Sequence, residues 1–124
     1  MQYDRAKLRA TILYAAKSCP PERMGATKLH KVLYFADMMA YAANGVSITG
    51  ATYRKRPFGP TCDELLPALR DLAIDGEIEI REVDYFGYTK KEFVAKTDAA
   101  DVLNEQERAL LDEVIGFVCH DHTA

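Results

Sequence analysis

Apolar residues recur at steps of three and four from Thr27 to Asn44, which is the spacing of one face of an α-helix. A second apolar set fills most of the remaining circumference, so we expect neighbouring elements to cover this helix on several sides. Thr27 is predicted as the N-cap, and Gly45 supplies the left-handed residue that ends many helices. The pattern predicts a central buried helix whose inward face consists of Leu29, Val32, Leu33, Ala36, Met39, Ala40 and Ala43.

Helical periodicity also marks the segment that precedes the central helix. Apolar positions at helical spacing predict a first helix over residues 4–17, with Asp4 as its cap. Pro20 and Pro21 then end it, because proline cannot donate a backbone hydrogen bond and restricts the residue before it. After the central helix, β-branched and aromatic residues over 51–56 predict a short extended segment followed by a turn.

A third helix is expected after this turn. Thr61 and Glu64 have the spacing of a capping box, so the helix is predicted to begin at about Cys62. It runs to the sequence Asp75-Gly76, and Pro67 inside it is expected to remove one backbone hydrogen bond and to bend it.

A hairpin and a final helix complete the predicted order. Residues 77–81 and 88–96 read as two strands joined by turn residues at 84–87. Asn104 and Glu107 have capping-box spacing and open the last helix. The fold class is therefore α+β, with one mostly helical domain over residues 1–124, a central buried helix, and a winged-helix-like helix plus β-hairpin.

The helix followed at once by a hairpin is typical of a winged helix-turn-helix domain, in which residues 62–75 would read DNA. That helix carries four acidic residues against Arg70 alone. Because a phosphate backbone is bound chiefly through Lys and Arg, we expect the winged architecture without DNA binding. A winged-helix DNA-binding transcriptional regulator remains the alternative function.

Composition and charge restrict the setting of the protein. The chain is 48% hydrophobic and 28% charged, with a net charge of −3, which gives no global reason to expect nucleic acid as a partner. Three cysteines are an odd number without metal-ligand spacing, so we expect no disulfide framework and a reducing environment. The chain shows no signal peptide and no apolar run long enough to span a bilayer, so it is predicted to be cytoplasmic.

Four polar side chains form a stripe along the central helix at spacings of four, three and four: His30, Tyr34, Asp37 and Tyr41. Two lysines, Lys28 and Lys31, lie beside this stripe. Two interpretations stay open. These groups either satisfy one another at the edge of the core, or they form part of a binding face. A catalytic pair of His30 and Asp37 is disfavoured, because two helical turns place them about 10 Å apart.

One basic run interrupts the acidic sequence. Arg54, Lys55 and Arg56 lie between Tyr53 and Phe58. The run is either a solvated strand edge or a cluster that recognises an acidic protein surface, since Arg and aromatic residues are enriched in binding hot spots. Nucleic-acid contact is a third alternative.

No residue pattern indicates an enzyme. Residues 119–122 contain Cys, His and Asp, but four crowded residues without a second cluster are a weak metal signal. Cys62 lies near a predicted helix start and has no His near it in sequence. We therefore predict no catalytic residue, no metal site and no cofactor.

Several motifs together resemble a known family. KLHKVLYFAD at residues 28–37 is followed by SITG at 47–50 and FGP at 58–60, and this combination is similar to the Panacea domain family of SocA-like antitoxins, often described as phage-associated proteins. The resemblance extends from about Leu8 to the opening of the last helix. The family usually continues with a further segment that contains a His, so this chain is either trimmed at its C-terminus or a short member.

The resemblance implies an antitoxin that neutralises a cognate toxin protein by direct contact, or an adaptor that hands the toxin to a AAA+ protease. It implies no enzymatic activity, and neither the toxin nor the oligomeric state follows from it. The stripe and the basic run supply the candidate partner-binding residues, which are His30, Lys31, Tyr34, Asp37, Tyr53, Arg54, Lys55, Arg56 and Phe58.

Overall fold

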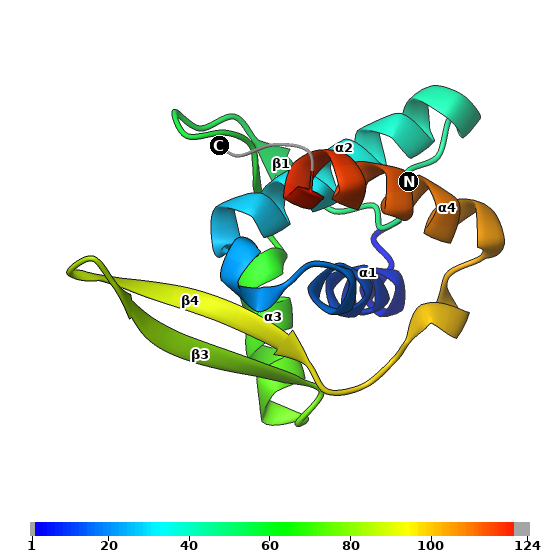
Figure 1. The fold of residues 1–124 in the computed structure, drawn as a ribbon. Helices are drawn as coiled ribbons and strands as arrows, with labels where there is room; N and C mark the ends of the chain where they lie inside the picture. The colour runs from blue at the N-terminus through cyan, green and yellow to red at the C-terminus, as the bar shows by residue number, and fades with distance from the viewer. Residues whose placement is uncertain (1, 121–124) are drawn as a thin grey trace.

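The computed structural model describes residues 2–120 and confirms the α+β class (Figure 1). The α-helices in this range are α1 (Arg5–Ser18), α2 (Ala26–Asn44), α3 (Leu65–Ile74) and α4 (Glu105–Ile115). Two separate antiparallel pairs contain the strands β1 (Tyr53–Arg54) with β2 (Thr61–Cys62), and β3 (Ile78–Tyr85) with β4 (Tyr88–Ala95). Short helical turns are η1 (Pro21–Arg23), η2 (Ala100–Val102) and the π-helix η3 (Gly116–His120).

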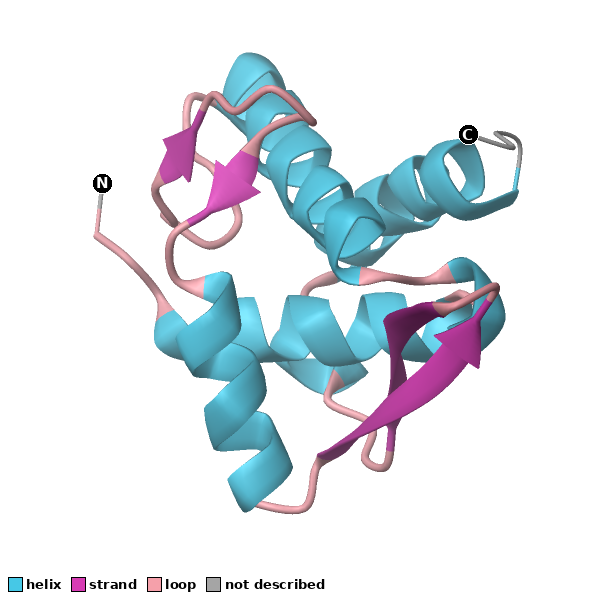
Figure 2. Cartoon of the chain, turned by 90° about the vertical axis from the view of Figure 1, so that its left-hand side faces the viewer, coloured by secondary structure: helices cyan, strands magenta, loops and turns pink. Residues whose placement is uncertain are grey.

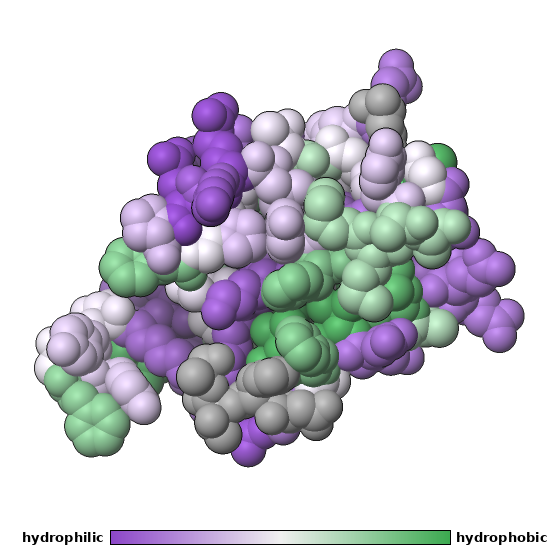
Figure 3. All heavy atoms as spheres, turned by 90° about the horizontal axis from the view of Figure 1, so that it is seen from above, coloured by the Kyte–Doolittle hydropathy of each residue, from purple (hydrophilic) through white to green (hydrophobic). Residues whose placement is uncertain are grey.

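Helix α2 lies at the centre and packs against α1, α4, β2 and η3. Most of its predicted inward face is buried, but two of the predicted residues are wrong, because Met39 is 37% exposed and Ala43 is exposed as well. The C-terminal half of α2 is thus open on one side, where Figure 3 shows apolar side chains gathered over α2 and α4. The prediction of Thr27 as N-cap is wrong, because the cap is Gly25, two residues earlier, and the helix begins at Ala26. Gly45 ends the helix with φ 75°, as expected.

The first and last helices confirm their predicted caps. The carboxylate of Asp4 accepts a hydrogen bond from the backbone N–H of Lys7, and this bond caps α1. At the start of α4, the side chains of Asn104 and Glu107 each accept from the backbone N–H of the other residue. Local sequence alone therefore fixes where both helices begin.

The expected start of the third helix is wrong. Thr61 and Cys62 pair with β1, so the helix begins only at Leu65. The carboxylate of Glu64 accepts from the backbone N–H of Thr52 at 2.9 Å and so closes no capping box. Pro67 consequently lies in the first turn of α3, where its missing N–H costs no helical hydrogen bond.

The predicted β3–β4 hairpin is confirmed, although β3 extends four residues beyond the predicted 77–81 and β4 ends one residue before the predicted 96. A two-residue turn connects them, and Phe86 and Gly87 both have positive φ, at 51° and 85°. Ile78 and Phe93 are buried at the inner end of the hairpin, and its tip projects from the helices (Figure 1). The two hairpins lie apart on the face shown in Figure 2.

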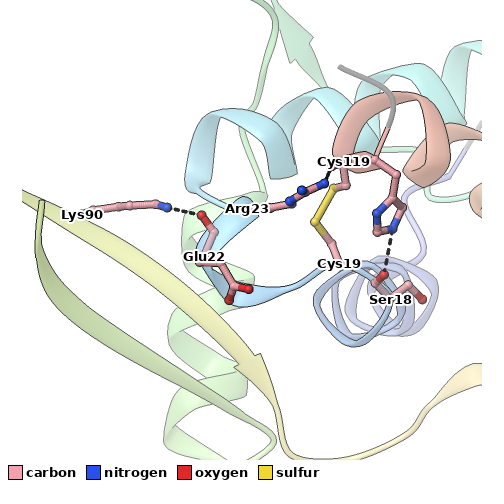
Figure 4. The surroundings of a disulfide bond; sticks show 7 residues. Ser18, Cys19, Glu22, Arg23, Lys90 and Cys119 are labelled. Carbon is pink, nitrogen blue, oxygen red and sulfur yellow. Dashed lines mark hydrogen bonds between the residues drawn. A yellow bond between two sulfur atoms is a disulfide. The ribbon is translucent and has the colours of Figure 1, made fainter. Parts of the chain in front are cut away.

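The expectation that the cysteines stay unpaired is wrong. Cys19, which follows α1, and Cys119 in η3 form a disulfide with their Cα atoms 6.1 Å apart, as Figure 4 shows. A sequence separation of 100 residues hid this pair. Cys62 is a buried free thiol. The disulfide removes the cysteine argument for a reducing environment, and a cytoplasmic location stays a prediction.

The described residues contain neither a membrane-spanning helix nor a metal-ligand cluster. No helix within residues 2–120 has the length and apolar character to cross a membrane. The same part of the chain holds no group of three or more His, Cys, Asp or Glu placed to bind a metal. Asp121 and His122 of the weak terminal metal signal lie outside the described residues.

Candidate functional site

The β1–β2 hairpin and α2 enclose a shallow basic pocket of about 620 Å³. It gathers five of the residues predicted from sequence, together with two prolines and a glycine: Tyr34, Tyr53, Arg54, Lys55, Arg56, Pro57, Gly59 and Pro60. Phe58, at the tip of the same hairpin, is 89% exposed. We call this set, with Phe58, the basic hairpin surface.

Asp37 lies beneath this surface rather than on it. Its side chain is buried, and one carboxylate oxygen accepts from the backbone N–H groups of Ile48 and Thr49, each at 2.9 Å. The other oxygen accepts from the hydroxyl of Thr49 and from the phenol of Tyr53, each at 2.5 Å. Asp37 therefore fixes the segment that leads into β1 and sets the orientation of Tyr53.

The two tyrosines of the pocket are held in a fixed arrangement. The rings of Tyr34 and Tyr53 meet edge to face, with centroids 5.5 Å apart. Burial, followed by the nearby Asp37 carboxylate, raises the pKa of Tyr53 far above its ordinary value. The phenol of Tyr53 thus stays protonated and donates to Asp37.

The three cations of the basic run differ in their partners. Arg54 donates from Nε to both carboxylate oxygens of Asp63, each at 2.9 Å, and this bond raises the pKa of the guanidinium. Lys55 and Arg56 are exposed and have no carboxylate partner among residues 2–120. These two side chains carry the uncompensated positive charge of the surface.

His30 and Lys31 support the hairpin from α2. Nδ1 of His30 accepts from the backbone N–H of Cys62 at 2.9 Å, so the imidazole anchors β2. The side chain of Lys31 lies against Gly59 in the turn between β1 and β2. A Cβ atom added to Gly59 would lie 3.5 Å from Cε of Lys31. Burial raises the pKa of the Cys62 thiol to about 12, which keeps it protonated and unsuited to nucleophilic chemistry.

A family model described as antitoxin SocA-like, Panacea domain, matches residues 29–123, which is most of the chain. The chain belongs to this SocA-like Panacea family. The resemblance seen in the sequence motifs is thereby confirmed. Comparisons with curated proteins and with solved structures give no match. Family membership gives this Panacea domain a role related to toxin–antitoxin systems and a toxin as its general type of partner, and it suggests a non-enzymatic role.

Parts of the surface of this Panacea domain were not predicted from sequence. Pro57, Gly59 and Pro60 line the pocket, although sequence reasoning treated them only as turn residues. Asp63, which neutralises Arg54, was assigned to the third helix. The FGP motif at residues 58–60 was the available signal, because two of its residues shape the pocket and the third forms the exposed tip.

Protonation of His30 is expected to destabilise the fold. A protonated ring cannot accept the bond from the Cys62 N–H, and burial lowers the pKa of His30 below its ordinary 6.5. The folded state then binds fewer protons than the unfolded state, so stability falls as pH drops from 6.5 through the folded pKa. We expect the urea midpoint of the natural chain to fall more over this range than that of His30→Gln. Equal pH dependences would contradict this role.

Proposed function

We propose that this Panacea domain neutralises a toxin protein by binding it through the basic hairpin surface. The observation that carries the proposal is the presence of two cations without carboxylate partners, Lys55 and Arg56, next to exposed Phe58 on a hairpin held by buried Asp37. Preorganised surfaces bind more tightly, because less side-chain and loop freedom is lost on association. The partner that fits has an acidic patch and an apolar depression for Phe58.

The mechanism is occlusion of the toxin. An interface of standard size buries roughly 1,600 Å² in total, which is enough to cover an active site without chemistry by the antitoxin. Phe58 would act as the central anchor, and the flanking cations would set orientation and association rate.

Binding of the toxin through this surface is also the first step of an adaptor mechanism. In that mechanism a second surface of the domain would contact a AAA+ protease, which then degrades the toxin. The half-life of the toxin separates the two mechanisms. Degradation by the protease predicts that the toxin persists in a protease-deficient strain, whereas occlusion predicts the same half-life in both strains.

The charge of α3 gives less support to a DNA-binding regulator. Acidic residues at α3 form ion pairs with α1, since Arg5 lies 3.4 Å from Asp71 and Arg9 lies 2.7 Å from Asp75. Arg70 is the only cation on α3. Phosphate contacts require Lys and Arg, so α3 lacks the charge of a reading helix.

Charge reversal at the basic hairpin surface is expected to abolish neutralisation. The double variant Lys55→Glu/Arg56→Glu should weaken toxin binding by about 100-fold or more, since two attractive contacts become repulsive. It should fold normally, because neither side chain has an ion pair within the described chain. The measurement is growth of cells that co-express the toxin encoded next to this gene, together with the affinity of the purified pair.

A charge-matched control is Lys17→Glu/Arg70→Glu, which alters two exposed cations on α1 and α3. Lys17 also pairs with Asp98 at 3.0 Å, but an exposed ion pair of this kind contributes little to stability. We expect this variant to neutralise the toxin as well as the natural chain. Unchanged growth and affinity in Lys55→Glu/Arg56→Glu would remove the basic hairpin surface from the proposal.

A further inference from the structure

A second basic cleft lies between the β3–β4 hairpin and the corner where η1 leads into α2. It has a volume of about 800 Å³ and ends at Cys119 and His120 of η3. Figure 4 shows how it is built, with Lys90 reaching from β4 to the carbonyl of Glu22, and Arg23 pointing toward the carbonyl of Cys119 at 3.5 Å. The disulfide forms part of the same corner.

The charge of this cleft is unbalanced. Among residues 2–120, its walls carry four cations, Arg23, Lys28, Lys90 and Lys91, against the single carboxylate of Glu22. Lys90 is used internally, since it also lies 4.0 Å from Glu92 and 5.5 Å from the ring centroid of Tyr85. Lys28 and Lys91 have no carboxylate partner within residues 2–120.

The positive charge of Lys28 does not stabilise the helix in which it lies. A cation in the first turn of a helix is disfavoured by the helix dipole, and Lys28 is the third residue of α2. A chain with a net charge of −3 thus concentrates uncompensated lysines on both walls of one cleft. Such a concentration favours an anionic ligand.

The mouth of the cleft adds an apolar component. Tyr85 lines it, and its ring meets that of Phe86 edge to face with centroids 4.7 Å apart. Phe86 and Tyr88 are 86% and 73% exposed at the hairpin tip. A ligand that joins carboxylates to apolar side chains can contact both parts of this surface.

The surroundings favour a short anionic segment over a long polyanion. Lys90 and Lys91 share β4 with Glu92, the neighbouring strand β3 carries Glu79 and Glu82, and Asp75 caps the C-terminus of α3 beside β3. A nucleic-acid backbone that extended beyond the cleft would meet these carboxylates and be repelled. A peptide confined to the cleft would meet fewer of these carboxylates, chiefly Glu82, which lies opposite Lys91 in the strand register.

We infer that this cleft binds an acidic, extended segment of a partner protein, with carboxylates on Lys28 and Lys91 and apolar side chains against the aromatic hairpin tip. The site is separate from the basic hairpin surface and does not depend on the proposed toxin contact. It gives the domain a second means of recognising a protein.

The test measures fluorescence anisotropy of a fluorescein-labelled peptide of alternating glutamate and leucine, titrated with the full chain. We expect saturable binding that weakens as salt rises, and a loss of about tenfold or more in Lys28→Glu/Lys91→Glu. Circular dichroism and the urea midpoint establish that this variant is folded. The charge-matched variant Lys17→Glu/Arg70→Glu should bind like the natural chain.

Three outcomes would overturn the inference. The first is no binding of the peptide by the natural chain. The second is binding that Lys28→Glu/Lys91→Glu leaves unchanged, or that only Lys55→Glu/Arg56→Glu removes. The third is tighter binding of a thymidine oligonucleotide of equal charge, which would assign the cleft to nucleic acid instead.

Discussion

Replacing Asp37 by Ala is expected to lower the free energy of unfolding by about 3–5 kcal/mol. The substitution leaves two backbone N–H groups and two hydroxyls without their acceptor, in a site where the carboxylate is buried. Each unsatisfied buried donor costs about 1–3 kcal/mol, and partial entry of water offsets part of the sum. Urea unfolding followed by circular dichroism measures the loss.

Two further variants separate the network from the volume of the side chain. Tyr53→Phe removes one donor and leaves the carboxylate with three, so a loss of about 1 kcal/mol is expected. Asp37→Asn keeps the shape and one accepting oxygen, and its loss should lie between those of the other two. An Asp37→Ala variant within about 1 kcal/mol of the natural chain would contradict the role of Asp37 as the support of the basic hairpin surface.

Removal of the Cys19–Cys119 disulfide is expected to cost about 3–5 kcal/mol. The bond closes a loop with a sequence separation of 100 residues, so it strongly restricts the unfolded chain. It also joins the end of α1 to η3, where His120 Nε2 lies 3.3 Å from the carbonyl of Ser18. Denaturant unfolding with and without a thiol reductant measures the contribution.

The double variant Cys19→Ala/Cys119→Ala should show the lower stability in both conditions and no response to reductant. Cys62→Ala, which alters the free buried cysteine, should keep the response of the natural chain to reductant. Identical midpoints of the natural chain in oxidising and reducing buffer would contradict the stabilising role of the disulfide.

Local patterns predicted the elements whose boundaries are decided locally. The caps at Asp4 and at Asn104 with Glu107 form within one helical turn, and the sequence located both helix starts. The capping pattern at Thr61 failed because a tertiary partner, the backbone N–H of Thr52, takes the Glu64 carboxylate. A local sequence pattern cannot show that a backbone N–H of another segment will take the carboxylate that the helix cap would need.

In the candidate site, too, the sequence showed the local pattern but not the tertiary contacts. The polar stripe on α2 was visible, but its interpretation depended on contacts 11 to 16 residues away, where Asp37 meets Ile48, Thr49 and Tyr53. Asp37 and His30 bond to other segments rather than to one another, while Tyr41 is 60% exposed. The disulfide lay beyond any spacing rule, since only the packing of α1 against the end of the chain brings its cysteines together.

Native mass spectrometry can test the proposal that this Panacea domain binds a toxin through the basic hairpin surface. The tagged chain is co-expressed with the product of the adjacent gene, and the masses of the purified species are measured. We expect a stoichiometric complex with a neighbour that is toxic when expressed alone, and free chain for Lys55→Glu/Arg56→Glu. A chain that emerges alone, with a neighbour equally harmless in its presence and absence, would contradict the claim.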